Sequence, residues 1–415
     1  MAAIKKAEIQ QVSSMAILPE HIIISHIFPK LHPKTLLRLQ CTNKFYKTLI
    51  SSQEFIDEHL HQSLSSSSHG LLIFFTAHVN GIQRLYSLDL DSPNSRAVYV
   101  PLPEPFHGEY NHFDIVGSSN GLLCLRSTIG NKHFSHYNGL GFLFLNPCTR
   151  MFGCSLYYPS LHVRSHEVGF GFGNDPKNND YKLVVIEFCN IWGRKLYGRT
   201  LVYGMKKHSW NCVERMKFLD LSDGMPTCLP INGVVIDRKL LHWVFLSKSK
   251  KVLGIGCFDV ELDRWADVSL PLPDYDEYDQ DGRATKVVNL GVFDGCLCLS
   301  TTIEGSNVTD VWVMKEYGVK ESWTKLLIAT PSCQYTPLFD YGEGMRRKLL
   351  LSIDWPHKLG VETCVWYNLS DQTTKKLELG GAPLYFKVLS LCFGSLVNIT
   401  GGRQIEAQRE VRRGG

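Results

Sequence analysis

The sequence lacks the features that would assign it to a secreted, membrane or nucleic-acid-binding class. Its 415 residues contain 44 Lys and Arg against 40 Asp and Glu, and a net charge of +4 indicates neither nucleic acid nor membrane as a partner. The first residues, MAAIKKAEIQQ, include no apolar segment typical of a signal peptide. The longest weakly polar run, 388–402, is short and interrupted by Gly394, Ser395 and Asn398, so we expect no transmembrane helix.

Cysteine is present, but without the spacing of a disulfide framework or a zinc site. The chain has 13 cysteines, an odd number, and we interpret them as reduced core residues. Cys296 and Cys298 are expected on one face of a predicted strand, yet no second pair or nearby histidine completes a zinc site. We therefore expect no metal and no cofactor, and a location in the cytoplasm, the nucleus or both.

Residues 17–50 are rich in aliphatic side chains at helical spacing. Ile23, Ile24, Ile27, Phe28 and Leu31 recur at intervals of one, three and four, which predicts a helix with one broad apolar face. That helix is expected to begin at Leu18-Pro19-Glu20, because proline and an acidic residue both suit a first turn.

Three more short helices are predicted after this one. Pro33 is expected to open the second, Asn43 to cap the third, and Ser51-Ser52-Gln53-Glu54 to form a capping box for the fourth. Four short helices in so few residues cannot bury this much apolar surface among themselves. Either another protein covers it, or the helices form a lid on the rest of the chain.

Beyond the serine run 65–68, short alternating strands recur in units of roughly fifty residues. One strand class begins at Gly70, Gly121, Tyr181, Lys239, Gly295 and Lys348, with successive starts 51, 60, 58, 56 and 53 residues apart. A second class follows each, marked by Tyr86, Phe144, Tyr203, Phe258, Trp312 and Tyr367. Units of this length with four strands each are typical of propeller blades. The segment Tyr385–Phe393 supplies a spare strand, which we predict completes the first blade.

Several motifs resemble catalytic sites but are better explained by structure. Gly117-Ser118-Ser119-Asn120-Gly121 fits a nucleophile elbow, but a strand follows it instead of a helix, which favours a hairpin turn at Asn120-Gly121. The run 169–173, GFGFG, precedes no helix and is interpreted as a bulged strand end. The acidic stretch 274–281 fails the calcium-loop spacing because Val288 would be the closing ligand. His59 and His61 are expected on a solvent-facing helix.

The helical segment resembles an F-box of the plant type. The resemblance is carried by Leu18-Pro19-Glu20, Ile27-Phe28-Pro29-Lys30-Leu31, Lys34-Thr35-Leu36-Leu37-Arg38 and Cys41–Ile50. The chain departs from the family at His32, where proline is usual, and at Tyr46, where tryptophan is usual. The resemblance implies docking to a Skp-type adaptor, which bridges to a cullin scaffold and a RING subunit. The residues it implies for adaptor contact are Leu18, Pro19, Ile22, Ile23, Ile27, Leu31, Leu36, Leu39, Cys41 and Tyr46.

The body resembles the plant F-box-associated domain, a kelch-like interaction domain. The matching motifs are Gly117–Cys124, Asn146-Pro147-Cys148-Thr149-Arg150 and Gly171–Leu183. The same family includes pollen S-locus F-box proteins. The resemblance implies a substrate-recognition subunit of a ubiquitin ligase, without an active site of its own, that binds a protein destined for ubiquitination and proteasomal degradation.

The predicted fold is a small all-α F-box of three to four helices followed by an all-β, six-bladed propeller closed by the C-terminal strand. The expected boundaries are a disordered N-terminus (1–14), the F-box (15–62), a linker (63–69), the propeller (70–399) and a disordered tail (400–415). The alternative from a different class is a propeller hydrolase or small-ligand binder with a helical lid. The substrate-binding residues are not assigned. Loops at 132–139, 189–198 and 274–283 vary as a recognition surface would.

Overall fold

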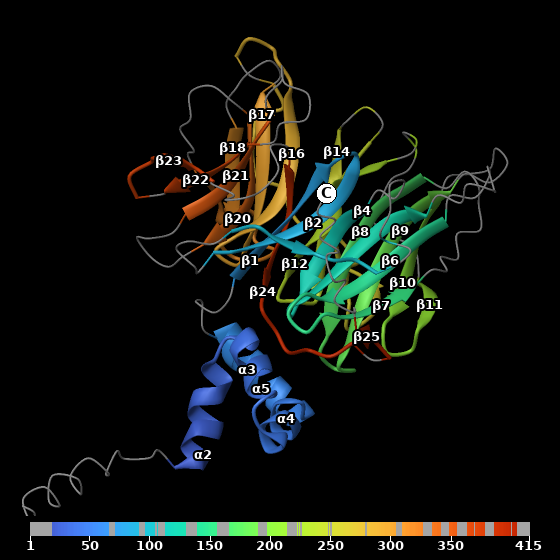
Figure 1. The fold of residues 1–415 in the computed structure, drawn as a ribbon. Coiled ribbons are helices and arrows are strands. Elements are labelled where there is room, and N and C mark those ends of the chain that lie inside the picture. The colour runs from blue at the N-terminus through green and yellow to red at the C-terminus, as the bar shows by residue number, and fades with distance from the viewer. Residues whose placement is uncertain are drawn as a thin grey trace, which may run out of the picture.

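The structure, a computed structural model, describes most of the chain in separate stretches. The described residues are 19–65, 71–90, 96–103, 106, 113–129, 139–155, 166–189, 197–213, 222, 224, 226–247, 249, 251–278, 280–303, 309–326, 334–341, 348–354, 363–368, 370–377, 386–399 and 401–404. Within them, a group of short helices precedes a large domain built of strands (Figure 1). Helices followed by an all-β domain is the order that the sequence predicts.

The helical part, called the helical module from here on, spans residues 19–65. Its elements are α2 (Glu20–Ile22), the π-helical η1 (Ile23–Ile27), the 3-10 helix η2 (Phe28–Lys30), α3 (Pro33–Leu39), α4 (Lys44–Ile50) and α5 (Gln53–Ser65). The first three form one continuous run that ends just before Leu31, whose extended backbone (ψ 145°) stops it. Helix α5 continues to Ser65, past the boundary at residue 62 expected from the sequence.

The strands of the β domain form five hydrogen-bonded sheets. One has the order β24 (Phe386–Phe393), β1 (Leu71–Val79), β2 (Ile82–Asp89), β3 (Val98–Val100). A second has β25 (Arg403–Gln404), β7 (Met151–Ser155), β6 (Gly139–Asn146), β5 (Leu122–Ile129), β4 (Phe113–Ser119). Two more run β16 (Thr285–Phe293), β17 (Cys296–Ile303), β18 (Thr309–Met314), β19 (Trp323–Leu326) and β20 (Gln334–Tyr341), β21 (Lys348–Asp354), β22 (Thr363–Asn368), β23 (Thr374–Lys376). The short helix η3 (Lys320–Ser322) precedes β19.

The fifth sheet has eight strands and differs from the prediction of six separate four-stranded units. Its order is β11 (Ser209–Val213), β10 (Tyr197–Gly204), β9 (Asp180–Cys189), β8 (His166–Asp175), β12 (Thr227–Ile236), β13 (Leu240–Leu246), β14 (Val252–Asp259), β15 (Arg264–Trp265). The two halves join through a parallel pairing of β8 with β12 at Phe170 and Asn232. The inner strands β8 and β12 thus meet edge to edge, and the domain is a propeller-like assembly of five sheets.

Strand β24 pairs antiparallel with β1, from Leu71 opposite Phe393 to Ala77 opposite Phe386. The C-terminal segment therefore supplies a strand to the first sheet, as the sequence predicts. The tail departs from expectation, since residues 403–404 form β25 against β7 where the sequence indicates disorder. Pairing of β24 with β1 joins the first strand of the β domain to a strand near its C-terminal end.

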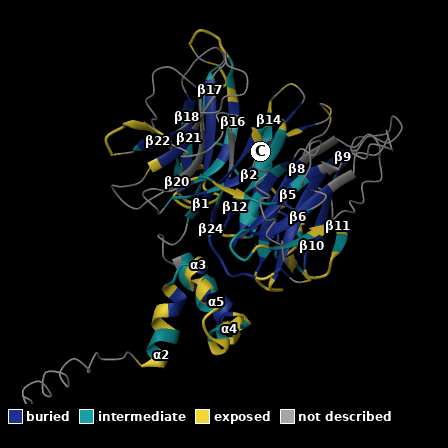
Figure 2. Ribbon diagram, viewed as in Figure 1, coloured by how far each residue is buried: buried dark blue, intermediate teal, exposed yellow. Residues whose placement is uncertain are grey.

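The sheets are buried on both faces, which explains their nearly continuous apolar sequences. On β1, Leu72 and Phe74 belong to one hydrophobic cluster, whereas Ile73 and Phe75 belong to another. Alternate residues of a strand point to opposite faces, so each face of this sheet meets a different neighbour. The dark blue strands of Figure 2 mark these buried layers.

Hairpin turns and glycines follow local rules that the sequence already indicates. Asn120 and Gly121 have φ of 49° and 83° and join β4 to β5, as a two-residue turn requires. The expectation of a hairpin in place of a nucleophile elbow is confirmed. In β8, a Cβ at Gly171 would lie 2.8 Å from both the Leu241 and Trp243 side chains. The GFGFG run is therefore a strand whose glycines let Trp243 pack closely, with its bulge at Glu167 and Gly169.

Candidate interaction surface

Side-chain caps fix where the helices of the module begin. His32 Nδ1 accepts a hydrogen bond from the Lys34 amide at 3.1 Å, and Pro33 follows as the first residue of α3. Asn43 Oδ1 accepts from the Phe45 amide at 2.8 Å and caps α4, which confirms the predicted cap. Ser52 caps α5 by accepting from the Phe55 amide at 3.3 Å, one residue later than the predicted Ser51. The departure at His32 is thus compatible with the fold.

One side of the module packs against the β domain. Leu36, Ile50, Phe55 and Ile56 are buried in the same hydrophobic cluster as strand residues of β4 to β10. Part of the lid interpretation is therefore correct, because the helices do cover a surface of their own chain.

The opposite side of the module exposes large apolar side chains. Ile27 is 36% exposed and Phe45 is 50% exposed, next to Tyr46, whose ring lies 5.9 Å from that of Phe45. Moving such a side chain from water into an apolar interior is favourable by about 1.5–3 kcal/mol. In Figure 2 exposed residues run along the outer faces of α2 and α4. This surface is the candidate site.

The sequence-predicted contact residues divide into three groups. Pro19, Ile27 and Cys41 are exposed, and Ile22, Ile23, Leu31, Leu39 and Tyr46 are half-buried. Leu36 is fully buried in the chain's own cluster, so in this structure it supports the helices from inside. Leu18 lies outside the described residues. Pro19, Ile27 and Cys41 therefore lie at the surface of the module, whereas Leu36 does not.

Phe45 is the site residue that sequence reasoning missed. Helix α4 turns the half-buried Tyr46 and Leu49 and the buried Ile50 toward the hydrophobic cluster, and Phe45 lies a hundred degrees away from Tyr46. Once Asn43 is accepted as the cap, this phase places Phe45 outside the buried face. The helical period therefore indicates that Phe45 is exposed. The family resemblance pointed to Tyr46 instead, because Tyr46 stands where the family usually has tryptophan.

A second expectation about the module is wrong. His59 does not face solvent on α5, since it is 1% exposed and its Nε2 lies 2.9 Å from the Leu31 carbonyl oxygen. The ring stacks on Phe55 with centroids 6.3 Å apart. His61, two residues later, is exposed as predicted. His59 therefore ties α5 to the end of the first helical run.

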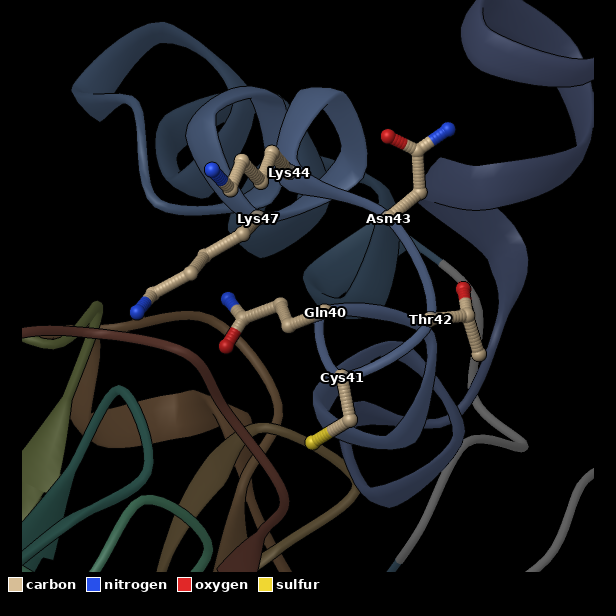
Figure 3. A pocket seen from close by; sticks show the side chains of 6 residues that line it. All are labelled: Gln40, Cys41, Thr42, Asn43, Lys44 and Lys47. Atoms are coloured by element: carbon tan, nitrogen blue, oxygen red, sulfur yellow. The ribbon is translucent and has the colours of Figure 1, made fainter.

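A shallow polar pocket of about 420 Å³ lies beside the apolar surface. Figure 3 shows its lining side chains, which come from the end of α3, the following turn and α4. They are Gln40, Cys41, Thr42, Asn43, Lys44 and Lys47. Hydrogen-bond donors and two ammonium groups suit acidic or carbonyl groups of a partner that covers the neighbouring Phe45.

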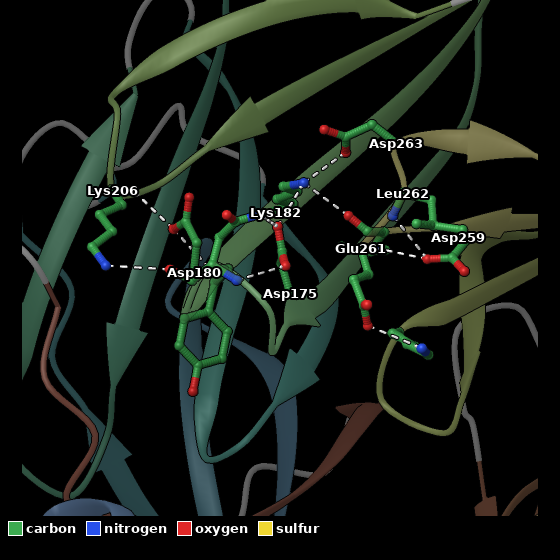
Figure 4. Close-up of polar contacts among 12 residues, drawn as sticks. Asp175, Asp180, Lys182, Lys206, Asp259, Glu261, Leu262 and Asp263 are labelled. Carbon is green, nitrogen blue, oxygen red and sulfur yellow. Dashed lines mark hydrogen bonds and ion pairs between the residues drawn. The ribbon is translucent and has the colours of Figure 1, made fainter. Parts of the chain in front are cut away.

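Charged groups in the β domain form a structural network, not a reactive one. Lys182 Nζ lies 2.8 Å from carboxylate oxygens of both Asp175 and Asp263 (Figure 4). Burial alone would raise the pKa of Asp175, but hydrogen bonds from Lys182 and Asn178 hold it below its usual value. The Lys182 pKa is raised, because the two carboxylates outweigh the burial that would lower it. These opposite shifts keep both partners charged.

A His, Tyr and Cys cluster also resembles a catalytic constellation. His242 Nε2 lies 2.7 Å from the Tyr317 hydroxyl, which lies 3.3 Å from Cys257 Sγ. Burial lowers the pKa of His242 to about 4 and raises the pKa of Cys257 to about 11. A protonated thiol beside a weakly basic imidazole is a poor nucleophile. The cluster instead joins β13 and β14 to the turn before η3.

Two further tests concern metals and membranes. Among the described residues, no group of three or more His, Cys, Asp or Glu side chains could hold a metal ion. No helix in the described part of the chain is long and apolar enough to cross a bilayer. Most of the predicted recognition loops 132–139 and 189–198 lie outside the described residues.

Short helices followed by a propeller-like domain define a class of two-part interaction proteins. Residues 84–399 match the model of the F-box associated beta propeller domain, so the chain belongs to that family. The F-box protein CPR1 of Arabidopsis thaliana is 29% identical over 422 residues, covering 95% of this chain and 94% of the relative. A second Arabidopsis F-box protein is 27% identical, covering 85% and 83%. A solved protein of unknown function from Dyadobacter fermentans has a TM-score of 0.42 at 12% identity, covering 66% and 84%.

Proposed function

We propose that the chain is a substrate-recognition subunit of a Skp-cullin-F-box ubiquitin ligase. The helical module binds a Skp-type adaptor, and the β domain binds a protein that is then ubiquitinated and degraded. The chain itself provides no catalytic group. It raises the effective concentration of a target near a ubiquitin-loaded enzyme held by the cullin and RING subunits.

The observation that carries this proposal is the pair of opposite faces on the helical module. One face is buried against the β domain, so a helical lid would need nothing more. The other face still exposes Ile27 and Phe45 beside Tyr46. A lid needs apolar side chains only on the face that contacts the β domain, so this second apolar face indicates a partner. We infer that the adaptor covers Pro19, Ile27, Cys41 and Phe45, together with Leu18.

The charge of this segment further defines the partner. Between Glu20 and Glu54 the chain has five Lys and Arg residues and no acidic residue. They are Lys30, Lys34, Arg38, Lys44 and Lys47. An acidic adaptor surface would complement them and speed association at low salt. Raising the ionic strength should slow association while leaving dissociation nearly unchanged.

The test is binding of the full-length chain to a purified Skp-type adaptor. Phe45→Ala and Ile27→Ala each remove an exposed apolar side chain, so the fold should be unaffected. We expect each to weaken binding by about tenfold or more, as truncation of a central interface residue does. The measurement is titration calorimetry or surface plasmon resonance on proteins with unchanged melting temperature.

Leu262→Ala is the matched control, because Leu262 is 48% exposed but lies in the β domain. Its affinity should equal that of the wild type. The double variant Leu18→Ala with Pro19→Ala tests the start of the first helical run in the same assay. Full binding by all helical-module variants would overturn the proposal.

We also propose that the eight-stranded sheet comprises two blades, giving a closed ring of six. Six clusters of buried apolar side chains support this count, since each joins two neighbouring groups of four strands. Within the eight-stranded sheet itself, Val184, Ile186 and Phe188 of β9 pack in one cluster with Leu241 and Trp243 of β13. Side chains of one flat sheet would not meet in this way.

The remaining expectations complete this proposal. We propose an F-box at residues 15–62 and a target-binding domain at 70–399. The target is a protein, with no nucleic acid, membrane or cofactor involved, and it is met in the cytoplasm or the nucleus. Membership of the family supports the adaptor, the cullin and the RING subunit as partners.

A further inference from the structure

The segment that follows β24 passes between the helical module and the β domain. We call residues 394–399 and 401–402 the strap. In Figure 1 it is the red chain that leaves β24 and reaches β25 just above the helices. At its far end, Arg403 and Gln404 pair with Phe152 and Met151 of β7. The strap is thus anchored at both ends to different sheets.

Buried polar contacts hold the strap to the β domain. The side-chain amide of Asn146, which is 0% exposed, donates to the Ser395 carbonyl at 3.1 Å and to the Val397 carbonyl at 2.8 Å. A Cβ added at Gly121 would clash with the Ser395 side chain, so the β4–β5 turn accommodates the strap closely. Asn146 is the last residue of β6, and its side chain satisfies carbonyl groups of the strap.

The other side of the strap meets the helical module. A Cβ at Gly394 would lie 3.2 Å from Pro33 Cγ and 3.3 Å from Cys148 Sγ. Pro33 is the first residue of α3, and Cys148 belongs to the turn after β6. The absence of a side chain at Gly394 therefore lets α3 approach the sheet edge. Beyond it, the apolar residues Leu396, Val397 and Ile399 are buried in the same cluster as Phe28, Leu36 and Ile50.

We propose that the strap is a coupling element that holds the helical module and the β domain as one rigid body. Gly394 and Pro33 act as positioning residues at its contact with α3. The consequence rests on the proposed function, because rigidity would fix the direction from the bound adaptor to the bound target. The coupling itself is independent of any partner and can be measured on the chain alone.

The test is hydrogen–deuterium exchange of full-length Gly394→Leu. A leucine at this position must push Pro33 away from Cys148. We expect amides of α3 and α5 to exchange about tenfold faster, because they lose a packed surface, while β4, β5 and β24 keep their protection. Small-angle scattering should show a larger radius of gyration with an unchanged helix content by circular dichroism.

Asn398→Leu is the matched control, since it places the same side chain on the same strap at an exposed position. Its exchange pattern and scattering should match the wild type. If Gly394→Leu also exposes the strands, Pro33→Ala decides, because it removes the ring contact from the helix side and leaves the β domain intact. Unchanged exchange of α3 and α5 in Pro33→Ala and in a folded Gly394→Leu would overturn the coupling.

Adaptor binding separates this inference from the proposed function. Gly394→Leu leaves Ile27 and Phe45 untouched, so its affinity for a Skp-type adaptor should remain within about twofold of the wild type. A chain that never binds adaptor but loosens in Gly394→Leu would retain the coupling and reject the proposed function. A chain that binds adaptor but does not loosen in Gly394→Leu would reject the coupling and retain the proposed function.

Discussion

At the scale of single residues, the most informative side chain of the β domain is His242. It is 0% exposed, and its Nδ1 lies 3.3 Å from the Val234 carbonyl while Nε2 faces the Tyr317 hydroxyl. Burial keeps the ring neutral, despite a weak opposing influence from Asp237. The imidazole is therefore a neutral link between two strands and a turn.

This burial predicts a pH dependence of stability. The pKa of His242 falls to about 4 in the folded state, below the unfolded value of 6.5. The unfolded chain therefore binds the proton first, and the stabilisation that is complete above pH 6.5 disappears as the pH falls toward 4. Over that window we expect a loss of about 3 kcal/mol in the free energy of unfolding.

His242→Gln isolates this contribution, because other groups titrate in both proteins. Urea unfolding at several pH values between 4 and 7 should give a shallower slope for the variant. Identical slopes for variant and wild type would show that His242 does not titrate as inferred. Tyr317→Phe should leave the pH dependence unchanged. It should lower the free energy of unfolding by about 1–3 kcal/mol, since His242 Nε2 loses its hydrogen-bond partner.

At the scale of elements, the turns of the eight-stranded sheet are joined by one lysine. Lys182 on β9 contacts Asp175 at the end of β8 and Asp263 in the turn before β15, and it also donates to the Val260 carbonyl at 2.9 Å. It therefore adds a side-chain connection between the two halves of this sheet, beside the pairing of Phe170 with Asn232 and the hydrogen bond from the Asn174 amide to the Arg238 carbonyl. A single ammonium group holds two hairpins in register.

Lys182→Met should destabilise the β domain strongly. Asp175 is 0% exposed, so removing the lysine leaves a buried carboxylate with only Asn178 as a donor, at a cost of about 3–5 kcal/mol. Chemical denaturation measures this change. The matched control is Lys239→Met, whose pair with Glu261 is much more exposed and should contribute far less to the free energy of unfolding. Equal effects of the two variants would contradict the assigned role.

The sequence predicts elements well where local chemistry decides them. Caps at Asn43 and turns at Asn120-Gly121 follow from residue type alone, and strand periodicity locates most strands of the β domain. The pairing of β8 with β12 does not follow, because a long-range contact of inner strands has no local signature. The burial of His59 also escapes prediction, since it depends on the carbonyl of Leu31, 28 residues away.

The candidate site was predictable in position but not in membership. Family resemblance indicated the helices that expose apolar side chains, but a helix of seven residues is too short for periodicity to assign its faces. For this reason Leu36, an expected contact residue, is buried inside the chain, whereas Phe45, which was not expected at the site, is exposed to solvent. Only the position of the neighbouring domain decides which apolar face of a short helix is free.

At the scale of the whole molecule, the chain is organised around the meeting of its two ends. The C-terminal strand β24 pairs with β1, and the strap that follows it contacts the helices encoded at the N-terminus. Leu391 and Cys392 of β24 also belong to different hydrophobic clusters, on opposite faces of the first sheet. Strand β24 and the strap thus stabilise parts of the structure that are distant in sequence.

Truncation should therefore unfold the β domain as a whole. A chain that ends before Pro383 lacks β24 and the strap, which leaves β1 as an unpaired edge and opens two clusters at once. We expect loss of the cooperative thermal transition by circular dichroism and a sharp fall in soluble yield, because an exposed apolar edge strand promotes aggregation. A chain that ends after Gln404 keeps every described C-terminal contact and should melt within about 2 °C of the full-length protein. A cooperative transition at the wild-type temperature in the shorter chain would show that the remaining strands close without β24.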